Sequence, residues 1–272
     1  MTTTIQEVAC FGATPSSGNA ALVIQGDHGT DAQRQQFARA SGRSACVFID
    51  PVADGDTQAD WVFDYVYPHA RSPLCLHATL AAGRVLLSEQ RPALRARTAL
   101  KGQLLDLALD GGEVAILLAP QTPPAVTVAP NLPAALLAAP GLALASAPAI
   151  ASVGSPKLLL EVADSATLLA LRPDLARIAD WGREHGVSGC YVYCRRPDGA
   201  YEGRNFNHLD PALEDTATGV AAGALTIQLG QAVTLYQGAQ LGQPCLIRTA
   251  MRDGRIAIGG AARLLPTPMQ SC

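Results

Sequence analysis

Residues 214–225, EDTATGVAAGAL, constrain the fold of this chain more than any other stretch. The segment begins with two carboxylates, passes through Thr and Gly, and continues into small and apolar residues. Asp, Thr and Gly suit a helix N-terminus, because their side chains or bare backbone can meet the first free N–H groups. Small residues also let a helix pack closely inside a domain. We therefore expect a loop that carries carboxylates and leads into a buried helix.

A similar segment occurs earlier, at residues 75–83, CLHATLAAG. Its ATLAAG portion can be laid on ATGVAAG at residues 217–223, with one extra residue in the second copy. Short matches between alanine-rich segments also arise by chance, so the alignment alone leaves an internal duplication open. If the duplication is real, each of two lobes contains a buried helix with an ionisable group at its N-terminus. These groups would be His77 and Asp215.

Length and composition favour a folded protein that does not bind nucleic acid. With 272 residues, 49% of them hydrophobic, the chain can form one large domain or two smaller ones with ample cores. The net charge is -3 and no basic block is present, which argues against nucleic-acid binding. The one long uncharged run, residues 126–153, is interrupted by prolines, which argues against a membrane span. The N-terminus lacks a signal-peptide pattern, so we expect a cytoplasmic protein.

Cysteine usage argues against a metal site. The seven cysteines are scattered and form no CxxC pair. No second cluster completes a zinc site, so we expect reduced thiols, mostly in the core. No phosphate-binding loop or Ser/His/Asp elbow is present either. The residue pattern therefore predicts no metal site.

The pattern of strands and helices predicts an α+β protein with two lobes. A Pro-rich segment, residues 119–124, marks the boundary. We expect an N-terminal lobe over residues 1–118 and a C-terminal lobe over 119–259, and the segment from about 260 to 272 could return to the first lobe. Among the expected helices are 31–41 with an Asp cap, 173–185 and the two buried ones. The expected strands include 45–49, 99–100, 104–110, 113–118 and 201–206.

Five segments together resemble the PhzF family of phenazine-biosynthesis-type isomerases, which are related to diaminopimelate epimerase and proline racemase. GNAALV at 18–23 resembles the family's GNPxAV, and LCLHATLAA at 74–82 resembles CGHATLAA. EDTATGVA at 214–221 resembles EDPATGSA. Gln237-Gly238 with residues 242–245 resembles QGxxxGRPS, and Gly259-Gly260 takes the place of the last GG. The segments keep the family's order over nearly the whole chain.

The resemblance implies a specific architecture. Each of two pseudo-symmetric lobes would be a curved, mostly antiparallel sheet wrapped round a central helix, with the active site in the cleft between lobes. It also implies a homodimer that works without metal or organic cofactor on a small carboxylate. The internal duplication then becomes the expected pseudo-symmetry.

The departures from the family pattern lie at its site residues. The family's general acid/base Glu belongs to a segment resembling SETTFV, which here reads SACVFI at 44–49, so Ala45 stands at the Glu position. Alanine cannot move a proton. The family's Ser after TG is Val220, and the Gly of its CGH is Leu76. The resemblance therefore implies an altered catalytic pair.

The candidate catalytic residues are Asp215 and His77, each with a structural alternative. Asp215 could act as acid or base, or merely cap a helix. His77 titrates near neutrality but could be a satisfied core histidine. We expect the substrate-binding residues to be Asn19, Cys75, Leu76, Ala45, Cys46, Thr218, Gly219 and Val220.

Two cysteines are weaker catalytic candidates. Cys75 lies at a helix N-terminus, where a thiolate is favoured. Cys46 is beside the missing Glu, but strand alternation would point it to the opposite face from Ala45. Glu214 is expected to cap or pair structurally. Arg71 could pair with a carboxylate, but we expect it to be solvated.

The leading functional hypothesis is a cofactor-independent isomerase. It would move a proton, and with it a double bond, in a small unsaturated carboxylic or amino acid, in bacterial secondary metabolism such as antibiotic biosynthesis. A dehydroproline-like substrate is one guess. Two alternatives stay open: the same scaffold could catalyse C–C or C–N hydrolysis or a cyclisation, or the protein could bind a small carboxylate without catalysis.

Overall fold

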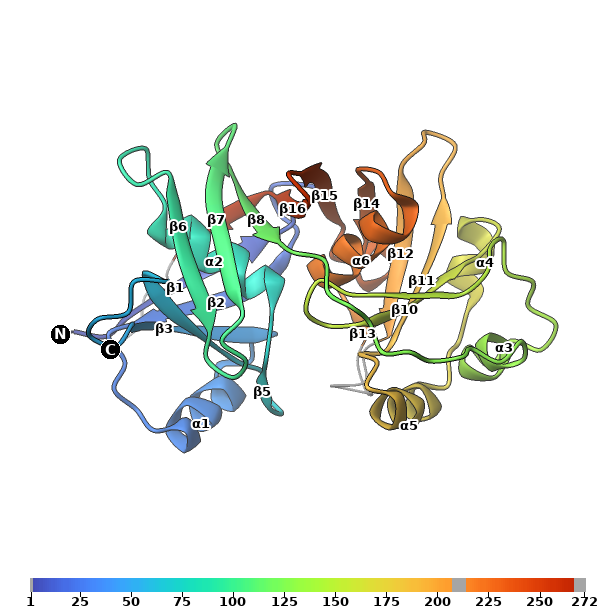
Figure 1. Ribbon diagram of the computed structural model, residues 1–272, viewed down its shortest axis with the longest axis horizontal. Helices are drawn as coiled ribbons and strands as arrows, with labels where there is room; N and C mark the ends of the chain where they lie inside the picture. The colour runs from blue at the N-terminus through green and yellow to red at the C-terminus, as the bar shows by residue number, and fades with distance from the viewer. Residues whose placement is uncertain (1, 207–213, 267–272) are drawn as a thin grey trace. The chain divides into compact units, whose positions relative to one another are not determined.

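The computed structural model describes residues 2–206 and 214–266. The chain divides into two compact units. Unit 1 contains the residues up to Leu118 and those from Gly259 onward, and unit 2 contains Ala119–Ile258. Strands and a smaller number of helices build both units, so the predicted α+β fold is confirmed (Figure 1).

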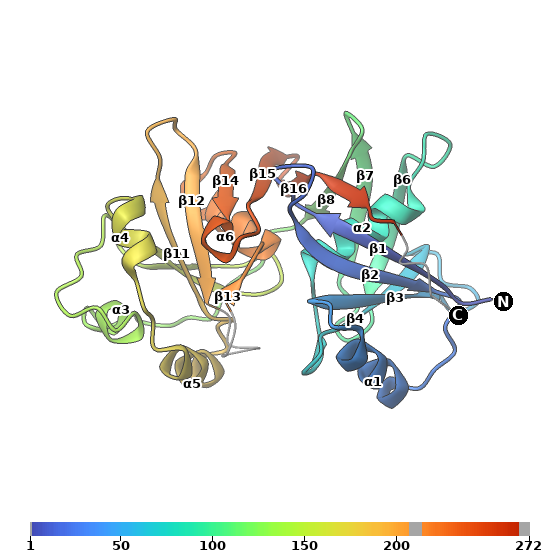
Figure 2. The same ribbon diagram turned by 180° about the vertical axis from the view of Figure 1, so that it is seen from behind.

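The elements of unit 1 follow one another in a simple order. They are β1 (Thr4–Cys10), β2 (Asn19–Gln25), α1 (Asp31–Ser41), β3 (Ala45–Pro51), β4 (Trp61–Val66), β5 (Arg71–Ser72), α2 (Leu76–Leu86), β6 (Ala93–Thr98), β7 (Leu104–Asp110), β8 (Glu113–Leu118) and β17 (Ala262–Leu264). Antiparallel pairs join β1 to β2 and β17, β3 to β4, β4 to β5, and β7 to β6 and β8. The parallel pairs β2–β3 and β4–β6 are each connected through a helix, as a parallel crossover requires. Figure 2 shows β2 between β1 and β3, with α1 leading into β3.

Unit 2 repeats this pairing scheme. Its elements are α3 (Leu132–Leu136), β9 (Ala149–Ala151), β10 (Lys157–Glu161), α4 (Ser165–Ala170), α5 (Leu175–His185), β11 (Cys190–Arg195), β12 (Tyr201–Phe206), β13 (Glu214–Asp215), α6 (Gly219–Leu229), β14 (Thr234–Gln237), the 3₁₀ turn η1 (Ala239–Leu241), β15 (Cys245–Arg252) and β16 (Arg255–Gly260), which begins in unit 2. Again two parallel pairs, β10–β11 and β12–β14, enclose helices. Antiparallel partners flank them: β9–β10, β11–β12, β12–β13 and β14–β15. The matching order confirms the pseudo-symmetry of the two units.

The central helices α2 and α6 are buried because their residues are small. The first eight residues of each helix are buried. A Cβ on Gly83 would come within 2.6 Å of Val114 Cγ1, and one on Gly223 within 2.8 Å of Ile258 Cδ1. Each glycine therefore sets how closely its helix approaches the sheet. In unit 1, α2 contacts β1, β2, β3, β8 and β17, so the sheet wraps round it as predicted.

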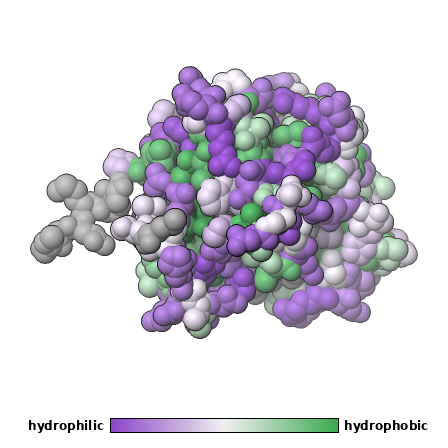
Figure 3. Space-filling view, turned by 60° about the vertical axis from the view of Figure 1, so that its left-hand side comes forward, coloured by the Kyte–Doolittle hydropathy of each residue, from purple (hydrophilic) through white to green (hydrophobic). Residues whose placement is uncertain are grey.

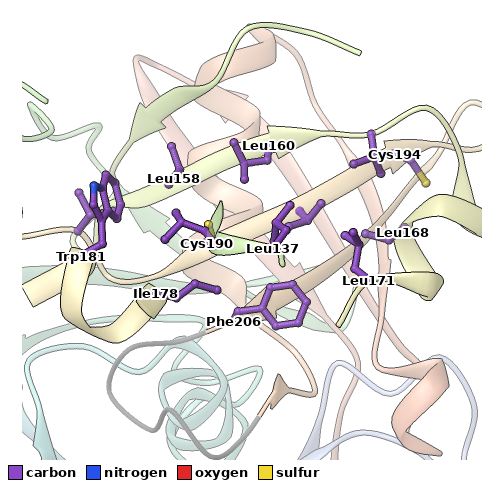
Figure 4. Packing of buried hydrophobic residues seen from close by; sticks show 14 residues of the cluster. Leu137, Leu158, Leu160, Leu168, Leu171, Ile178, Trp181, Cys190, Cys194 and Phe206 are labelled. Carbon is purple, nitrogen blue, oxygen red and sulfur yellow. The ribbon is translucent and has the colours of Figure 1, made fainter. Parts of the chain in front are cut away.

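The other helices cover the opposite face of each sheet. In unit 1, Cys46 and Phe48 of β3 pack with Ala38 of α1. In unit 2, Leu158 and Phe206 belong to a larger cluster that also includes residues of α3, α4 and α5 (Figure 4). Strand residues alternate between this outer face and the face toward the central helix, as the period of a strand requires.

Helix ends follow the sequence signals with one correction. The cap of α1 is Thr30, not Asp31: its hydroxyl accepts from the Gln33 N–H and the Gln33 side chain accepts from the Thr30 N–H. Asp31 lies in the first turn. Asp174 caps α5 through the Arg177 N–H, and the helix ends at Gly186 in the left-handed conformation.

One strand prediction was wrong, and the Ala- and Pro-rich run contains a strand that was not predicted. Residues 99 and 100 form a turn, and the strand lies just before them, as β6. The sequence ALRART of β6 alternates buried and exposed residues, a signal masked by its two arginines. The short strand β9 was not predicted, because it lies in the Ala- and Pro-rich run.

On the face shown in Figure 3, hydrophobic residues form small groups among hydrophilic ones. No helix within residues 2–206 and 214–266 is long and apolar enough to cross a membrane.

Candidate functional site

In unit 1 the candidate residues gather at the N-terminus of α2. Cys75 is the N-cap in an extended conformation, and its side chain makes no capping hydrogen bond. His77 follows in the first turn and is only 5% exposed. Asn19, at the start of β2, is equally buried. Ser44, immediately before β3, joins these side chains.

The hydrogen bonds assign a tautomer to His77. The Ser44 hydroxyl donates to the backbone carbonyl of Ala20 at 2.6 Å or to Asn19 Oδ1 at 2.7 Å. Because its one hydrogen is used there, His77 Nε2–H donates to Ser44 Oγ, at 3.3 Å. In the neutral ring, Nδ1 is then an acceptor, and the Cys75 thiol, 3.4 Å away, can donate to it. A neutral imidazole in this form can accept a proton at Nδ1.

Ala45, Cys46 and Leu76 were also predicted to bind substrate, and they differ in position relative to His77 and Ser44. Ala45 is buried beside Ser44 and offers only a methyl group. Cys46 points to the opposite face and packs in the cluster around α1, where burial raises the pKa of its thiol to about 11. It is not brought together with His77, so we leave it out of the proposed site. Leu76 is the first residue of α2 and is buried.

In unit 2 the candidate residues gather at the N-terminus of α6. Asp215 ends β13, and its Oδ2 accepts a hydrogen bond of 2.6 Å from the Thr218 hydroxyl. Thr218 is the N-cap but makes no side-chain capping bond, and its hydrogen bond to Asp215 orients this carboxylate next to the start of the helix. Gly219 and Val220 are the first two residues of α6, and both are buried.

Gln237 fixes the loop that carries Asp215. Its Nε2 donates to the Asp215 carbonyl at 2.7 Å and to Thr218 Oγ1 at 3.1 Å, while its Oε1 accepts from the Tyr191 hydroxyl at 3.2 Å. Gly238 follows with φ of +81°, and a Cβ there would lie 2.5 Å from the Thr216 carbonyl oxygen. The QG pair therefore holds this loop against the end of β14.

The structural repeat corrects the alignment proposed from sequence. In unit 1, Ser72 pairs with Tyr65 and α2 starts four residues later; in unit 2, Asp215 pairs with Asn205 and α6 starts four residues later. Asp215 therefore corresponds to Ser72. By the same count Thr218 corresponds to Cys75 and Val220 to His77.

The sequence alignment had instead placed Thr218 on Thr79. Thr79 is the fourth residue of α2 and donates to the Cys75 carbonyl. The structural repeat is present, but the sequence alignment matched Thr218 with a residue one helical turn too far along α2.

Glu214 and Arg71 each form an ion pair within their own unit. Glu214 forms a two-pronged ion pair with Arg204, at 2.9 and 2.7 Å, as expected for a structural carboxylate. Arg71 was expected to be solvated, and this was wrong: it pairs with the buried carboxylate of Asp64, 2.9 Å away, and with Asp31.

Sequence reasoning missed Ser44 as a site residue. Ser44 is the first residue of the SACVFI segment, directly before Ala45. Its hydroxyl, next to the position that departs from the family pattern, was the signal in the sequence. Among the described ranges, 2–206 and 214–266, no group of three or more His, Cys, Asp or Glu side chains is placed to hold a metal ion.

Comparison with known proteins agrees with this architecture. The model of the phenazine biosynthesis-like (PhzC-PhzF) family matches residues 8–265. An uncharacterised isomerase of Deinococcus radiodurans is 32% identical over 94% of this chain and 91% of its own. A predicted epimerase of Pseudomonas aeruginosa is similar in structure, with a TM-score of 0.76, 24% identity and 96% coverage of both chains.

A PhzF-family protein of Enterococcus faecalis gives a TM-score of 0.75 at 21% identity, with 98% of each chain covered. The family match spans nearly the whole chain, through both buried helices and both candidate groups. The chain belongs to the phenazine biosynthesis-like (PhzC-PhzF) family, whose relatives here are named isomerases.

Proposed function

We propose that the protein is a cofactor-independent isomerase that moves a proton, and with it a double bond, in a small unsaturated carboxylic or amino acid. Family membership and the isomerase relatives support the reaction class. The substrate remains a proposal from the resemblance, with a dehydroproline-like acid of bacterial secondary metabolism as the first compound to test.

The observation that carries this proposal is the hydrogen-bonded state of His77. A buried imidazole that is neutral and has Nδ1 as an acceptor can take a proton, and the contacts of Nε2 with Ser44 and of Ser44 with Asn19 orient the ring for this. Proton transfer needs a group that takes the proton and a group that returns one. Asp215, oriented by Thr218, is the second group that we propose.

The first turns of α2 and α6 suit a substrate carboxylate. Free N–H groups at a helix N-terminus and the helix dipole favour negative charge. Cys75, Leu76, Thr218, Gly219 and Val220 contribute these turns. Ala45, which we expect to replace the family Glu, leaves the proton work to His77 and Asp215.

Incubation with candidate substrates in deuterated water tests the reaction. We would use small unsaturated carboxylic and amino acids, including dehydroproline, and follow them by proton NMR and mass spectrometry. Deuterium at a substrate carbon, with a shifted double bond, supports the isomerase. A cleaved or cyclised product supports the first alternative, and binding without any change supports a carboxylate-binding protein.

Two substitutions test the assigned residues. We expect His77→Gln and Asp215→Asn each to lower the rate of deuterium incorporation by about 100-fold or more. The exposed residues His28 and Asp180 provide matched controls, His28→Gln and Asp180→Asn, which should keep the wild-type rate. Full activity in both site variants, with the fold intact by circular dichroism, would refute the assignment.

The family resemblance also leads us to propose a cytoplasmic homodimer. Light scattering after size-exclusion chromatography distinguishes the single chain of 28.2 kDa from twice that mass.

A further inference from the structure

A row of polar side chains crosses the inner face of the unit 2 sheet, beneath α6. Tyr191 pairs with Asn205 across β11 and β12, and Asn205 pairs with Asp215 across β12 and β13. Cross-strand partners share a face of the sheet. On β10, Lys157 lies two residues before Leu159, the partner of Tyr191, and so belongs to the same face. The outer face carries Phe206 and its apolar cluster instead.

Lys157 is an unusual member of this row. It is 1% exposed, and its Nζ donates to the backbone carbonyl of Ser188. Lysine is almost never fully buried without a partner, because removing an ammonium group from water costs several kcal/mol. The hydrogen bond to one carbonyl compensates only a small part of the ammonium charge. A nearby anion would favour the charged form of Lys157 in this buried position.

Asp215 is the anion that acts on Lys157. Burial lowers the pKa of Lys157 to about 8, and the Asp215 charge opposes this fall. The thiol of Cys190 also acts on Lys157, but burial raises the pKa of this thiol to about 12 and keeps it neutral. Burial likewise raises the pKa of Tyr191 well above its usual value. Neither α6 nor β9 contains a titratable side chain, and Glu161, at the other end of β10, acts on Tyr193.

The Asn205 amide lies between the two charges in strand order. Asn205 is fully buried, and neither its Oδ1 nor its Nδ2 has a hydrogen-bond partner among the described residues. An unpaired buried amide costs about 1–3 kcal/mol, so such a group calls for a functional explanation. Its polarity suits the place: Oδ1 can accept from the Lys157 ammonium and Nδ2 can donate to the Asp215 carboxylate.

We propose that Lys157 is a positioning residue for Asp215, and that its ammonium group acts on the Asp215 carboxylate through the Asn205 amide. The inference rests on the proposed role of Asp215 in proton transfer. The ammonium charge stabilises the negative charge of the Asp215 carboxylate, and loss of the ammonium at alkaline pH removes this stabilisation. Lys157 itself need not touch the substrate.

The chain is well suited to a direct test, because it contains only two lysines, Lys101 and Lys157. Protein grown with lysine labelled with ¹³C at Cε gives two resonances, which a Lys101→Arg variant assigns. Lys101 is exposed and serves as the internal reference in each pH titration. The experiment needs no substrate, so its outcome is independent of whether the proposed isomerisation is correct.

We expect Asp215→Asn to lower the titration midpoint of Lys157 by at least about one pH unit, since it removes the stabilising anion. Asn205→Leu, which keeps the volume and removes the amide, should lower the midpoint in the same direction. The double variant should add little to Asp215→Asn alone, because both changes interrupt one path. Asn205→Asp, which adds a carboxylate beside the ammonium, should raise the midpoint.

An unchanged Lys157 midpoint in Asp215→Asn, with the Lys101 resonance and the thermal unfolding curve as in wild type, would overturn the proposal. A midpoint that Asp215→Asn lowers and Asn205→Leu leaves alone would refute the bridging role of the amide. If Asp215→Asn does not fold, the upward shift in Asn205→Asp remains as the test. Where a substrate exchanges deuterium, Lys157→Met should also move the alkaline limb of the pH–rate profile, which a purely structural lysine would leave in place.

Discussion

The two units share one topology, and at one pair of corresponding positions the acidic and the basic residue of an ion pair are exchanged between them. In unit 1, Asp64 on β4 pairs with Arg71 on β5. At the corresponding places of unit 2, Arg204 on β12 pairs with Glu214 on β13. The short strand that leads to the central helix is thus fixed by a charge pair in both units, with the signs exchanged. The two units therefore share this local geometry with opposite placement of the charges.

The inner faces differ more strongly. In unit 1, the positions under α2 that match Lys157, Tyr191 and Asn205 are Ala21, Val47 and Tyr65. Tyr65 is satisfied, since its hydroxyl bonds with Thr79 Oγ1 at 2.6 Å. Unit 1 keeps its polar groups at the helix N-terminus, around His77, whereas unit 2 extends them across the sheet. The same frame therefore supports a compact imidazole group in one unit and a buried charged row in the other.

The ion pairs should differ in strength. Asp64 is 1% exposed and binds both Arg34 and Arg71, whereas Glu214 is less buried and binds Arg204. We expect Asp64→Asn to lower the free energy of unfolding by about 3–5 kcal/mol, because two arginines lose a buried partner. Glu214→Gln should cost less. Urea unfolding measures both, and an equal or larger effect at Glu214 would contradict the comparison.

Lys157 should give unit 2 a pH dependence that its counterpart Ala21 cannot give unit 1. Burial lowers the pKa of Lys157 from 10.5 to about 8, so the folded state binds fewer protons than the unfolded state between these values. The contribution to stability therefore rises with pH over that window, by at most about 3 kcal/mol. Lys157→Met should abolish this rise.

The exposed Lys101→Met is the matched control for that measurement and should leave the pH dependence unchanged. Urea unfolding at pH values from 7 to 11 provides the curves. A wild-type slope that persists in Lys157→Met would show that another group titrates there.

The close approach of each central helix can be compared through its glycine. Gly83→Ala and Gly223→Ala each place a Cβ against a neighbouring side chain, at 2.6 and 2.8 Å. We expect losses of about 1–3 kcal/mol from overpacking, with the larger loss at Gly83. Differential scanning calorimetry would show whether the two variants affect one transition or two. Unchanged stability at either site would mean that the surrounding side chains can move aside.

The caps of the outer helices should matter least. Thr30 caps α1 and Asp174 caps α5. Thr30→Ala and Asp174→Ala should each cost about 1 kcal/mol. Similar losses, read as shifts in thermal unfolding, would show that both units depend equally on these ends, and no loss at Thr30 would argue against its capping box.

Local patterns predicted most elements of the fold. Strand β7 over Leu104–Asp110 and helix α1 over Asp31–Ser41 match the sequence expectations, because alternation and capping signals are local. Strand β6 was not predicted, because two arginines in a short segment are typical of an exposed loop. In the fold, Arg95 and Arg97 pair with carboxylates. Long-range partners of this kind are invisible in a single sequence.

The candidate site was only partly accessible from sequence. Helix N-termini with His77 and Asp215 followed from motifs. The place of Ser44 against His77 depends on β3 lying beside β2, and the place of Lys157 under α6 depends on the register of four strands. Which side chains become neighbours in this way is determined by the strand order, which the sequence does not show directly. For the same reason, the alignment of the two similar segments matched Thr218 with Thr79, whereas the structure matches it with Cys75.

The exchanged signs of the two ion pairs have a consequence for folding. A chain with two copies of one strand order can mispair, with a strand of one copy taking the place of its twin. If β13 took the place of β5 on β4, Glu214 would lie opposite Val66 and diagonally next to Asp64. If β5 took the place of β13 on β12, Arg71 would lie opposite Phe206 and diagonally next to Arg204. Diagonal neighbours on paired strands are within reach of long side chains, so these like charges would repel each other. The exchanged charges therefore disfavour pairing of β5 or β13 with the strand of the other unit. The two short strands cannot replace each other, although their backbones are alike.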